Sequence, residues 1–492
     1  MDRSQLVIVT GIGPVPDDKQ RKVYAPGLRL LAISRAVRDA GNRVIMGEAA
    51  FSEDIETYRN AELDKNVRMV DSDIERRSLP LDPVRAAKII SFWVKKERPA
   101  AIVSNTDVMN LASAMQTPSV PKWMDFNGHP MAERQEIARI HESDEGLLAQ
   151  WSYVAPALLT GDHFSTCSTP QKYALMGELG AVGRLNRHTS GHDLVSVLPP
   201  GPVLHEGKPR EERIFRGKDV PEDAFCLLWT GGFNTWVDEE TLFKGVEEAM
   251  KSSKKLHFVL TGGEIRGHNE VTFRRFKQRV EQSPFRERFH FYGWVPLADL
   301  PNFYTESDAA INIDRYTSEG VLGCRNRLFS WMHYDLPALT TPESEITRLL
   351  VNRQLAAGFK TGDAGSLSEL LVRIIRNPGP YREMAARANK FIHEEYTYEK
   401  LLKPLSEWIE NPSLAPDKSA GRVIAAESEE WGEIVIPDNS LSKMHMEGVK
   451  SASDLSLLRE KLSRAEDELK RVHGSRAWRL IRRIKKIFGG QG

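Results

Sequence analysis

The chain has 492 residues, of which 40% are hydrophobic and 28% are charged, a composition typical of globular proteins. A chain of this length is too long for one hydrophobic core, so we expect two or three domains. Lysine and arginine number 68, as do aspartate and glutamate, and this balance excludes the overall basic excess that is typical of nucleic-acid-binding proteins.

The cysteines and the N-terminus indicate the compartment. Cys167, Cys226 and Cys324 lie far apart, with no CxxC pair and no metal-ligand spacing, so we expect free thiols in a reducing environment. The N-terminal residues lead directly into a strand-like run, which leaves no room for a signal peptide, and no apolar run reaches transmembrane length. We therefore expect a cytoplasmic protein.

Short β-branched runs alternate with helical periodicity over the first 200 residues, which predicts βαβ units around a parallel sheet. A strand over Leu6–Thr10 is followed by a glycine-containing loop and by a helix from Gly27 to about Ala40. Further strands are predicted at Arg43–Met46, Val67–Val70, Ala101–Ser104, Pro121–Phe126 and Val195–Leu198. The proline cluster Pro199–Pro202 interrupts the pattern and is the predicted hinge between two domains.

The next 180 residues repeat the alternation more clearly and predict a second doubly wound α/β domain. The predicted strands are Phe225–Thr230, His257–Thr261, Phe289–Tyr292, Ala309–Ile313, Ala338–Thr341 and Ala357–Lys360. The predicted helices are Glu239–Lys251, Phe273–Gln282, Ala298–Glu306, Arg327–Tyr334, Glu343–Asn352 and Ser366–Asn377. Two more helices, around Tyr381–Glu394 and Tyr398–Glu410, end the globular part.

The C-terminal segment has a different character. Proline, serine and acidic residues dominate from Pro412 to about Ser451, which indicates a linker, and apolar residues then follow an a/d pattern from Leu455 to Val472, which predicts a short coiled coil. The predicted segments are two Rossmann-like domains (1–200 and 201–380), closing helices (381–411), the linker (412–452), the coiled coil (453–473) and a basic amphipathic tail (474–492).

The best candidate site is the segment Thr230–Asp238, which follows the first strand of the second domain and leads into a helix. Ligands of doubly wound sheets bind beyond the carboxyl ends of the strands, where helix N-termini offer N–H groups to phosphate. Gly231 and Gly232 let backbone amides approach an anion closely, and Gly263, in the second glycine pair, extends the predicted cleft. The alternative is that the Gly-Gly loop forms only a tight turn.

A second cluster lies between the fourth strand of this domain and the next helix. It places the carboxylate of Glu319 and the guanidinium groups of Arg325 and Arg327 at the mouth of the predicted cleft. Arginine matches phosphate oxygens with two hydrogen bonds, and a glutamate can hold sugar or ribose hydroxyls. The alternative is a surface cluster of salt bridges.

Several segments together resemble the retaining GT-B glycosyltransferases of family 4, and within them a bacterial polysaccharide-assembly subgroup. The second domain carries the resemblance in Gly231-Gly232 through Trp236 and Asp238, Phe291–Pro296, Glu319 through Arg325–Arg327, and Asp335–Thr341. The first domain adds Pro26–Arg29, Trp123–Phe126, and Gly177 through Gly180, Gly183, Arg184 and Asn186. The order and the spacing of these motifs, over roughly residues 5–410, make the resemblance specific.

The resemblance implies transfer of a sugar from a nucleotide diphosphate sugar to an acceptor, with retention at the anomeric carbon and without a metal or another cofactor. It places the nucleotide on the second domain and the acceptor mostly on the first. Glu319 is similar to the first of the family's two glutamates, which contacts the donor sugar. The Gly231-Gly232 loop would hold the diphosphate, and Arg325 or Arg327 would neutralise the charge that develops on the departing nucleotide.

The chain also departs from the family pattern. Ser330 stands where the second glutamate is expected, and a serine does not hold two ribose hydroxyls as a carboxylate does. Phe233 and Asn234 stand where an arginine is often found, and we assign Asn234 to the donor site. Trp236 and Trp294 either line the cleft or belong to the core. A catalytically silent relative is therefore an alternative.

In the first domain, Asp125 ends a predicted strand that faces the cleft and is followed closely by His129. Either group could accept the proton of the acceptor hydroxyl. The alternative for Asp125 is that it caps the following helix. Arg29 either contacts phosphate or acceptor, or is a solvated helix residue.

The tail combines charge with an apolar face and contains no acidic residue between Trp478 and Phe488. Its basic residues are Arg476, Arg479, Arg482, Arg483, Lys485 and Lys486. Each contributes about 1 kcal/mol near an anionic leaflet, so we expect peripheral binding to the inner face of a membrane rather than to nucleic acid. The coiled coil suggests self-association or docking to a partner enzyme.

The sequence therefore predicts a glycosyltransferase that acts on a glycan or lipid-linked acceptor in bacterial surface polysaccharide synthesis. A non-catalytic GT-B module that binds sugar or scaffolds a glycan assembly complex is the alternative. An epimerase would need a cluster of histidines and acids, and a phosphorylase would need a lysine that anchors pyridoxal phosphate; neither is identifiable.

Overall fold

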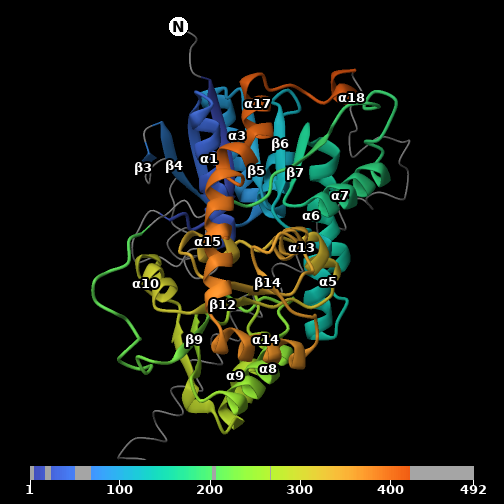
Figure 1. Ribbon diagram of the computed structural model, residues 1–492. Helices are drawn as coiled ribbons and strands as arrows, with labels where there is room; N and C mark the ends of the chain where they lie inside the picture. The colour runs from blue at the N-terminus through green and yellow to red at the C-terminus, as the bar shows by residue number, and fades with distance from the viewer. Residues whose placement is uncertain are drawn as a thin grey trace, which may run out of the picture. The chain divides into compact units, whose positions relative to one another are not determined.

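The computed structural model describes residues 5–16, 24–49, 68–71, 73–201, 207–265 and 268–420. Two sheets organise these residues, and helices pack on both faces of each (Figure 1). The predicted coiled coil and basic tail lie outside the described residues. Within the described ranges, no helix is both long enough and apolar enough to cross a membrane.

The first sheet has the strand order β3-β4-β2-β1-β5-β6-β7-β8 and is parallel except for the β3–β4 pair. Its strands are β1 (Leu6–Ile12), β2 (Arg43–Ala49), β3 (Arg68–Asp71), β4 (Ile74–Leu79), β5 (Ala101–Asn105), β6 (Lys122–Phe126), β7 (His163–Thr166) and β8 (Val195–Val197). Its helices are α1 (Ala25–Asp39), α3 (Pro83–Glu97), α4 (Asp107–Ala114), α5 (Pro130–His141), α6 (Leu147–Thr160) and α7 (Thr169–Ala181).

The second sheet is parallel throughout, with the order β11-β10-β9-β12-β13-β14. Its strands are β9 (Phe225–Trp229), β10 (Leu256–Thr261), β11 (Phe289–Gly293), β12 (Ala309–Asn312), β13 (Ala338–Thr340) and β14 (Ala357–Gly358). Its helices are α8 (Glu239–Ser252), α9 (Val271–Gln282), α10 (Leu300–Thr305), α11 (Ser318–Leu322), α12 (Arg327–His333), α13 (Glu345–Asn352), α14 (Ala364–Arg376) and α15 (Gly379–Glu394).

Alternation along the central strands explains why both sheets are buried on two faces. In β1, Val7 and Val9 pack with α1 on one face, whereas Ile8 packs with α3 and α4 on the other. In β9, Leu227 packs with α8 and α14, whereas Leu228 packs with α12 and α15. A parallel strand buried on both faces must be apolar at every position, which is why the sequence pattern identified these strands. All six strands predicted for the second sheet are present.

Two strands of the first sheet were not predicted. Strand β4 was missed because its sequence contains Glu75, Arg76 and Arg77, which break the apolar run. Arg76 is nevertheless buried, because it pairs with the carboxylate of Glu48 on the neighbouring strand β2. Strand β7 has only four residues and begins with His163. Tertiary pairing, rather than local sequence, therefore makes both segments strands.

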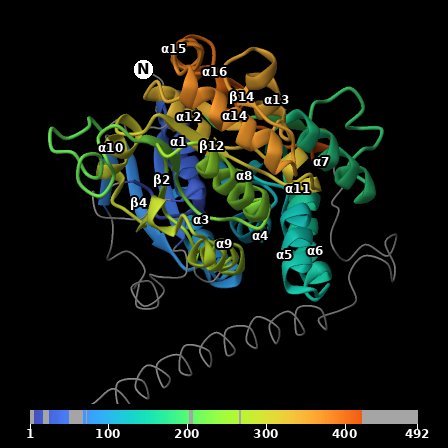
Figure 2. The ribbon, with the colours of Figure 1, turned by 60° about the horizontal axis from the view of Figure 1, so that its bottom comes forward.

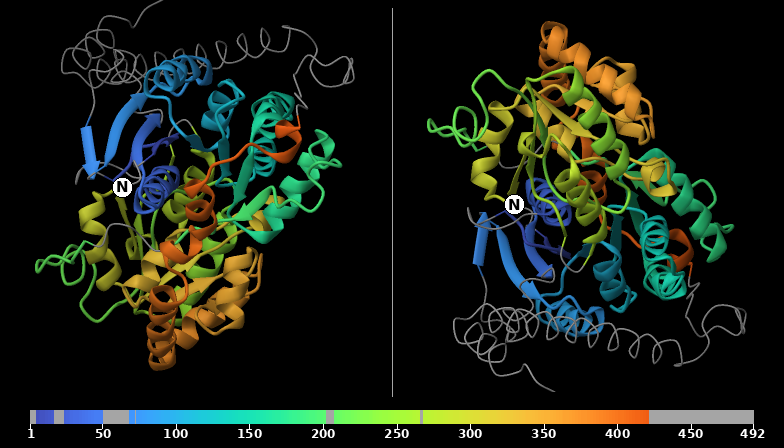
Figure 3. Two further views of the ribbon diagram at one scale, coloured as in Figure 1. Left: turned by 90° about the horizontal axis from the view of Figure 1, so that it is seen from above. Right: turned by 90° about the horizontal axis from the view of Figure 1, so that it is seen from below.

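After the second sheet, the chain returns to the first. Helices α16 (Tyr398–Leu401) and α17 (Lys403–Glu410) pack against α1, and Leu405 and Ile409 join its core (Figures 1 and 3). The segment predicted as a linker also begins in folded structure, since α18 (Pro416–Ser419) carries the buried Asp417. Asp417 forms a fully buried ion pair with Arg184 at 2.8 Å. Residues 412–420 therefore belong to the folded unit, which corrects the predicted start of the linker.

Candidate active site

A cavity of about 610 Å³ lies between the carboxyl ends of the two sheets' strands. The first half contributes the loops after β1 and β6 and the helices α4, α5 and α6, and the second half contributes the loops after β9, β10 and β11 and the segment 319–330. Most of the predicted site residues line it, namely Arg29, Gly231, Gly232, Asn234, Trp236, Trp294, Glu319, Arg325 and Arg327. Asp125, His129 and Gly263 are not part of its lining.

The two glycine loops pair with each other at the floor of the cavity. The Gly231 N–H donates to Thr261 O at 3.0 Å, and the Gly263 N–H donates to Gly231 O at 3.2 Å. Gly231 and Gly262 have φ values of 89° and 90°, and a Cβ on Gly262 would overlap the backbone of Gly231. Glycine is thus required here for the close approach of two loops. Because the Gly231 N–H bonds to the neighbouring loop, this amide is not free for the diphosphate that the Gly231-Gly232 loop was predicted to hold, and the part of the prediction that concerns Gly232 stays a prediction.

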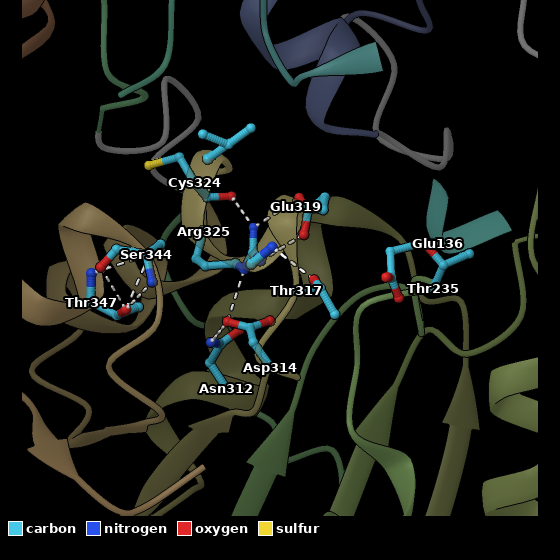
Figure 4. Close-up of polar contacts among 12 residues, drawn as sticks. Glu136, Thr235, Asn312, Asp314, Thr317, Glu319, Cys324, Arg325, Ser344 and Thr347 are labelled. Atoms are coloured by element: carbon cyan, nitrogen blue, oxygen red, sulfur yellow. Dashed lines mark hydrogen bonds and ion pairs between the residues drawn. The ribbon is translucent and has the colours of Figure 1, made fainter. Parts of the chain in front are cut away.

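Arg325 joins two buried carboxylates of the second cluster (Figure 4). Its Nε donates to Asp314 Oδ2 at 2.9 Å, and its terminal nitrogens donate to the Glu319 oxygens at 3.2 and 2.9 Å. Burial opposes its charge, but Asp314 and Glu319 more than offset this and raise the pKa of Arg325. A guanidinium that is already neutralised favours a positioning role for Arg325 over the predicted contact with a diphosphate.

Glu319 lies in the first turn of the short helix α11, where the Thr317 hydroxyl caps the helix by accepting from the Gly320 N–H at 3.0 Å. Its carboxyl group lines the cavity although the residue is only 3% exposed. Burial raises the pKa of Glu319 to about 7, and Arg325 opposes this shift. A carboxyl group that titrates near neutrality can accept or donate a hydrogen bond to a hydroxyl of a bound sugar.

Arg327 differs from Arg325 because no carboxylate pairs with it among the described residues. Its Nη2 donates to Gly232 O at 3.1 Å, and its guanidinium carbon lies 4.4 Å from the centre of the Trp229 ring. Its Nη1 is buried without a hydrogen-bond partner in the described part of the chain. Burial lowers the pKa of Arg327 to about 10. A desolvated cation with an unused donor beside a cavity is a site for an anion.

The predicted aromatic residues have distinct roles. Trp236 packs on the core of the second sheet and stands 5.3 Å from the guanidinium carbon of Arg325. Trp294 donates from Nε1 to Glu264 O at 2.9 Å and packs edge-on against Tyr24 of the first half, with ring centres 5.2 Å apart. Both therefore support the cavity wall as well as line it.

Asp125 does not face the cavity. It is fully buried, pairs with Arg29 through two hydrogen bonds of 3.0 and 2.7 Å, and accepts from the Ser165 hydroxyl at 2.6 Å. These contacts contradict both predicted roles, as proton acceptor and as helix cap. The cap of α5 is His129, whose Nδ1 accepts from the Ala132 N–H at 3.2 Å. Burial lowers the pKa of His129, so its imidazole is held in the neutral form that capping requires.

Sequence reasoning missed the polar wall that the first half presents to the cavity. Asp107, Glu133 and Gln150 all line it, from α4, α5 and α6. No individual helix was predicted around these positions, and a polar residue between predicted strands is unremarkable, so no local signal marks them. On the opposite side, Ser330 lines the cavity and hydrogen-bonds with Tyr304, and no carboxylate stands at this position.

Hydrogen bonds also join the two halves beside the cavity. Arg139 of α5 donates to Thr235 O at 2.9 Å, and the Ser168 hydroxyl donates to Leu322 O at 2.5 Å. Figure 2 shows α5 next to α11, the helix that carries Glu319. The segment of the second half that carries Glu319 is thereby held next to α5, the helix of the first half that carries Glu133.

Comparison with known proteins supports this architecture. A family model described as glycosyl transferase-like matches residues 244–407. The structure resembles sucrose-phosphate synthase from Thermosynechococcus elongatus, with a TM-score of 0.61, 13% identity, and coverage of 82% of this chain and 98% of that one. The chain has the GT-B fold. This confirms the predicted α/β architecture of two doubly wound domains.

Other GT-B structures agree. HepE from Anabaena, solved in complex with UDP and glucose, has a TM-score of 0.57 and 13% identity, and the match covers 83% of this chain and all of that one. A glycosyltransferase from Rickettsia africae has a TM-score of 0.56 and 13% identity, with coverage of 84% and 100%. No curated protein sequence matches the chain. At these identities the likeness is one of fold, so the chemistry must be argued from the site.

Proposed function

We propose that this protein is a glycosyltransferase that transfers a sugar from a nucleotide diphosphate sugar to a glycan or lipid-linked acceptor. The single observation that carries the proposal is Arg327, a buried guanidinium without a carboxylate partner at the edge of the cavity. Its charge would be compensated by the diphosphate of the donor, whose charge grows as the bond to the sugar breaks. The UDP and glucose in the complex of HepE, which has the same fold, support this choice of ligand.

The remaining groups have roles that suit the same reaction. Glu319 would hold hydroxyls of the donor sugar, and Arg325 would fix the position of Glu319. Retention at the anomeric carbon, membership of family 4 and independence of metal ions follow from the sequence resemblance, as does a role in bacterial surface polysaccharide synthesis. Among the described residues, no three His, Cys, Asp or Glu side chains are grouped so that they could hold a metal ion.

Two measurements test this proposal, first nucleotide binding and then turnover. Addition of UDP, ADP or GDP at one hundred times its Kd should stabilise the protein by about 2.7 kcal/mol, seen as a raised melting temperature. A panel of the corresponding nucleotide sugars, incubated with EDTA, should then yield free nucleotide for one donor. Binding without turnover over the whole donor and acceptor panel would support the non-catalytic alternative instead, and no binding of any nucleotide would refute the transferase.

The C-terminal tail, which lies outside the described residues, is proposed to hold the enzyme on the cytoplasmic face of an anionic membrane. Six basic residues beside an apolar face are the supporting feature of residues 474–492. Removal of the residues after Gly474 should abolish co-sedimentation with anionic vesicles that contain about 30 mol% phosphatidylglycerol. Full-length protein should bind these vesicles and not neutral ones, and equal binding of the truncated protein would contradict the proposal.

A further inference from the structure

The first half of the cavity carries its own unpaired cation, Arg134 of α5. Its Nη2 donates to Glu145 O, which is its only hydrogen-bond partner among the described residues. Its Nε is buried without a partner in that part of the chain, where no carboxylate pairs with the guanidinium. Native folds rarely bury a donor of this kind without using it. Because Arg134 lines the cavity, a ligand there would supply the missing acceptor.

The loop after α5 holds this guanidinium in place. Gly146 has a φ of 86° and lies directly against the group, since a Cβ on this residue would overlap Nη2 and Cζ of Arg134. The loop joins α5 to α6, and these two helices pack side by side (Figure 2). Arg134 is therefore positioned by backbone atoms of the first half alone.

The neighbouring Glu133 adds a hydrogen-bond donor to this wall. Burial, together with the carboxylates of Glu319 and Asp107, raises the pKa of Glu133 to about 8, and Arg325 opposes this shift. At neutral pH most of the Glu133 side chains therefore carry a proton. A protonated carboxyl group donates through its O–H. The wall thus offers an anion both a cation and a neutral donor.

The other two acids of the wall are already engaged. Asp107 accepts from the Gln150 amide at 2.6 Å and from the Val108 N–H at 2.9 Å, and burial raises its pKa. Glu319 is paired with Arg325 at 2.9 Å. An anion that enters beside α5 therefore meets a positive charge that neither of these acids compensates.

Arg134 and Arg327 are fixed to different halves of the same cavity. Arg327 is bonded to Gly232 O at 3.1 Å on the second half, whereas Arg134 is held by Glu145 O on the first. Two unpaired cations on opposite walls suit two separate anionic groups. Since the donor diphosphate is assigned to Arg327, Arg134 is left for the molecule that receives the sugar.

We propose that Arg134 is a binding residue for the acceptor, and that the acceptor carries a phosphate or diphosphate. Such a group suits this wall because it has several anionic oxygens, which can accept from Arg134 Nε and from the Glu133 carboxyl group at once. The assignment concerns binding alone. It adds no group to the transfer step and is therefore compatible with retention at the anomeric carbon. It rests on the proposed transferase function and names the acceptor class.

Inorganic pyrophosphate tests the site without an acceptor. The full chain is first saturated at pH 7 with the nucleoside diphosphate that it binds, so that the donor site is filled, and pyrophosphate is then titrated in a calorimeter. The parent protein should still bind it. Arg134→Met should weaken this binding by about tenfold or more, because a charged hydrogen bond is lost, with the Kd of the nucleotide unchanged within about twofold.

Two further variants control this measurement. Arg134→Lys keeps the charge and should recover part of the pyrophosphate affinity. Arg85→Met changes an exposed arginine of α3 that lies outside the cavity lining, and it should bind pyrophosphate like the parent protein.

Acceptor use then identifies the source of the phosphate. One sugar is offered with a free reducing end, as its 1-phosphate, and linked through a diphosphate to a lipid. The parent protein should have a KM about tenfold lower for a phosphate-bearing form, and Arg134→Met should lose this preference through KM rather than kcat. A low KM for the lipid-linked form alone assigns the phosphate to a lipid headgroup. An equally low KM for the 1-phosphate assigns it to a soluble acceptor, and both outcomes support the inference.

Other results would overturn the inference and leave the transferase proposal intact. They are the absence of pyrophosphate binding to the nucleotide-saturated parent protein, equal pyrophosphate binding by Arg134→Met, and equal KM values for the neutral and phosphate-bearing sugars. Weaker nucleotide binding in Arg134→Met would place this arginine in the donor site and would also overturn it. Absence of nucleotide binding in the parent protein would instead refute the transferase proposal itself.

Discussion

Replacement of Arg327 by methionine should weaken nucleoside diphosphate binding about 100-fold, which corresponds to about 2.8 kcal/mol, without destabilising the fold. The affinity should fall because the variant lacks the cation that meets the diphosphate, and hydrogen bonds between charged groups are stronger than neutral ones. The fold should be kept, or become more stable, because burial disfavours the charged form of this side chain and lowers its pKa. At neutral pH the folded state therefore holds this charge less favourably than the unfolded chain does.

Calorimetric titration with the nucleotide and urea denaturation measure the two effects separately. Arg348→Met is the matched control, since Arg348 is exposed on α13, and it should change neither quantity by more than about 0.5 kcal/mol. Unchanged nucleotide affinity in Arg327→Met would remove the observation on which the proposed function depends. A large loss of stability would show that this guanidinium serves the fold rather than a ligand.

Replacement of Arg325 by methionine should have the opposite result and lower the free energy of unfolding by about 3–5 kcal/mol. The variant would leave Asp314 and Glu319 buried without their cation, and an unpaired buried charge costs far more than the pair contributes. Arg325→Lys should recover little, because an ammonium group cannot make the three directed hydrogen bonds that the guanidinium makes with these carboxylates.

The loss in Arg325→Met should also depend on pH. Burial already raises the pKa of Glu319 to about 7, and removal of the opposing cation raises it further. A carboxyl whose pKa is raised in the folded state stabilises the fold below its unfolded value of 4.5, and this stabilisation is lost as pH rises through the folded value. Urea denaturation should therefore show a smaller loss at pH 5 than at pH 8. The control is the exposed ion pair between Arg274 and Glu270 on the surface of α9. Arg274→Met should lower the free energy of unfolding by less than about 1 kcal/mol.

The sequence predicted those structural elements whose residues are buried by contacts that a local hydrophobic pattern reveals. It did not predict elements that depend on a partner far away in the chain. The six strands of the second sheet were predicted, because the central ones, such as β9 and β10, are apolar runs buried on both faces and the others keep their spacing between predicted helices. Strand β4 was not, because the buried Arg76 pairs with Glu48, which lies 28 residues earlier in the sequence. A pattern of hydrophobic spacing carries no information about such a partner.

The site shows the same limit. The sequence placed Glu319, Arg325 and Arg327 together because they lie within nine positions, but it could not distinguish the neutralised arginine from the unpaired one. That distinction arises from Asp314 and from the geometry of the loop. Glu133 was missed because it joins the site only when α5 packs beside α11, and a glutamate in the first turn of a helix is otherwise ordinary.

The return of α17 and α18 to the first half has a consequence for the order of biosynthesis. Leu405, Ile409 and Asp417 complete packing that begins with Val7 and with Arg184. During translation, the ribosome must therefore synthesise the entire second domain before the N-terminal one can close its interior. The early-emerging domain waits as an unfinished intermediate with apolar surface exposed, and this delay makes it a natural client for chaperones that bind nascent chains.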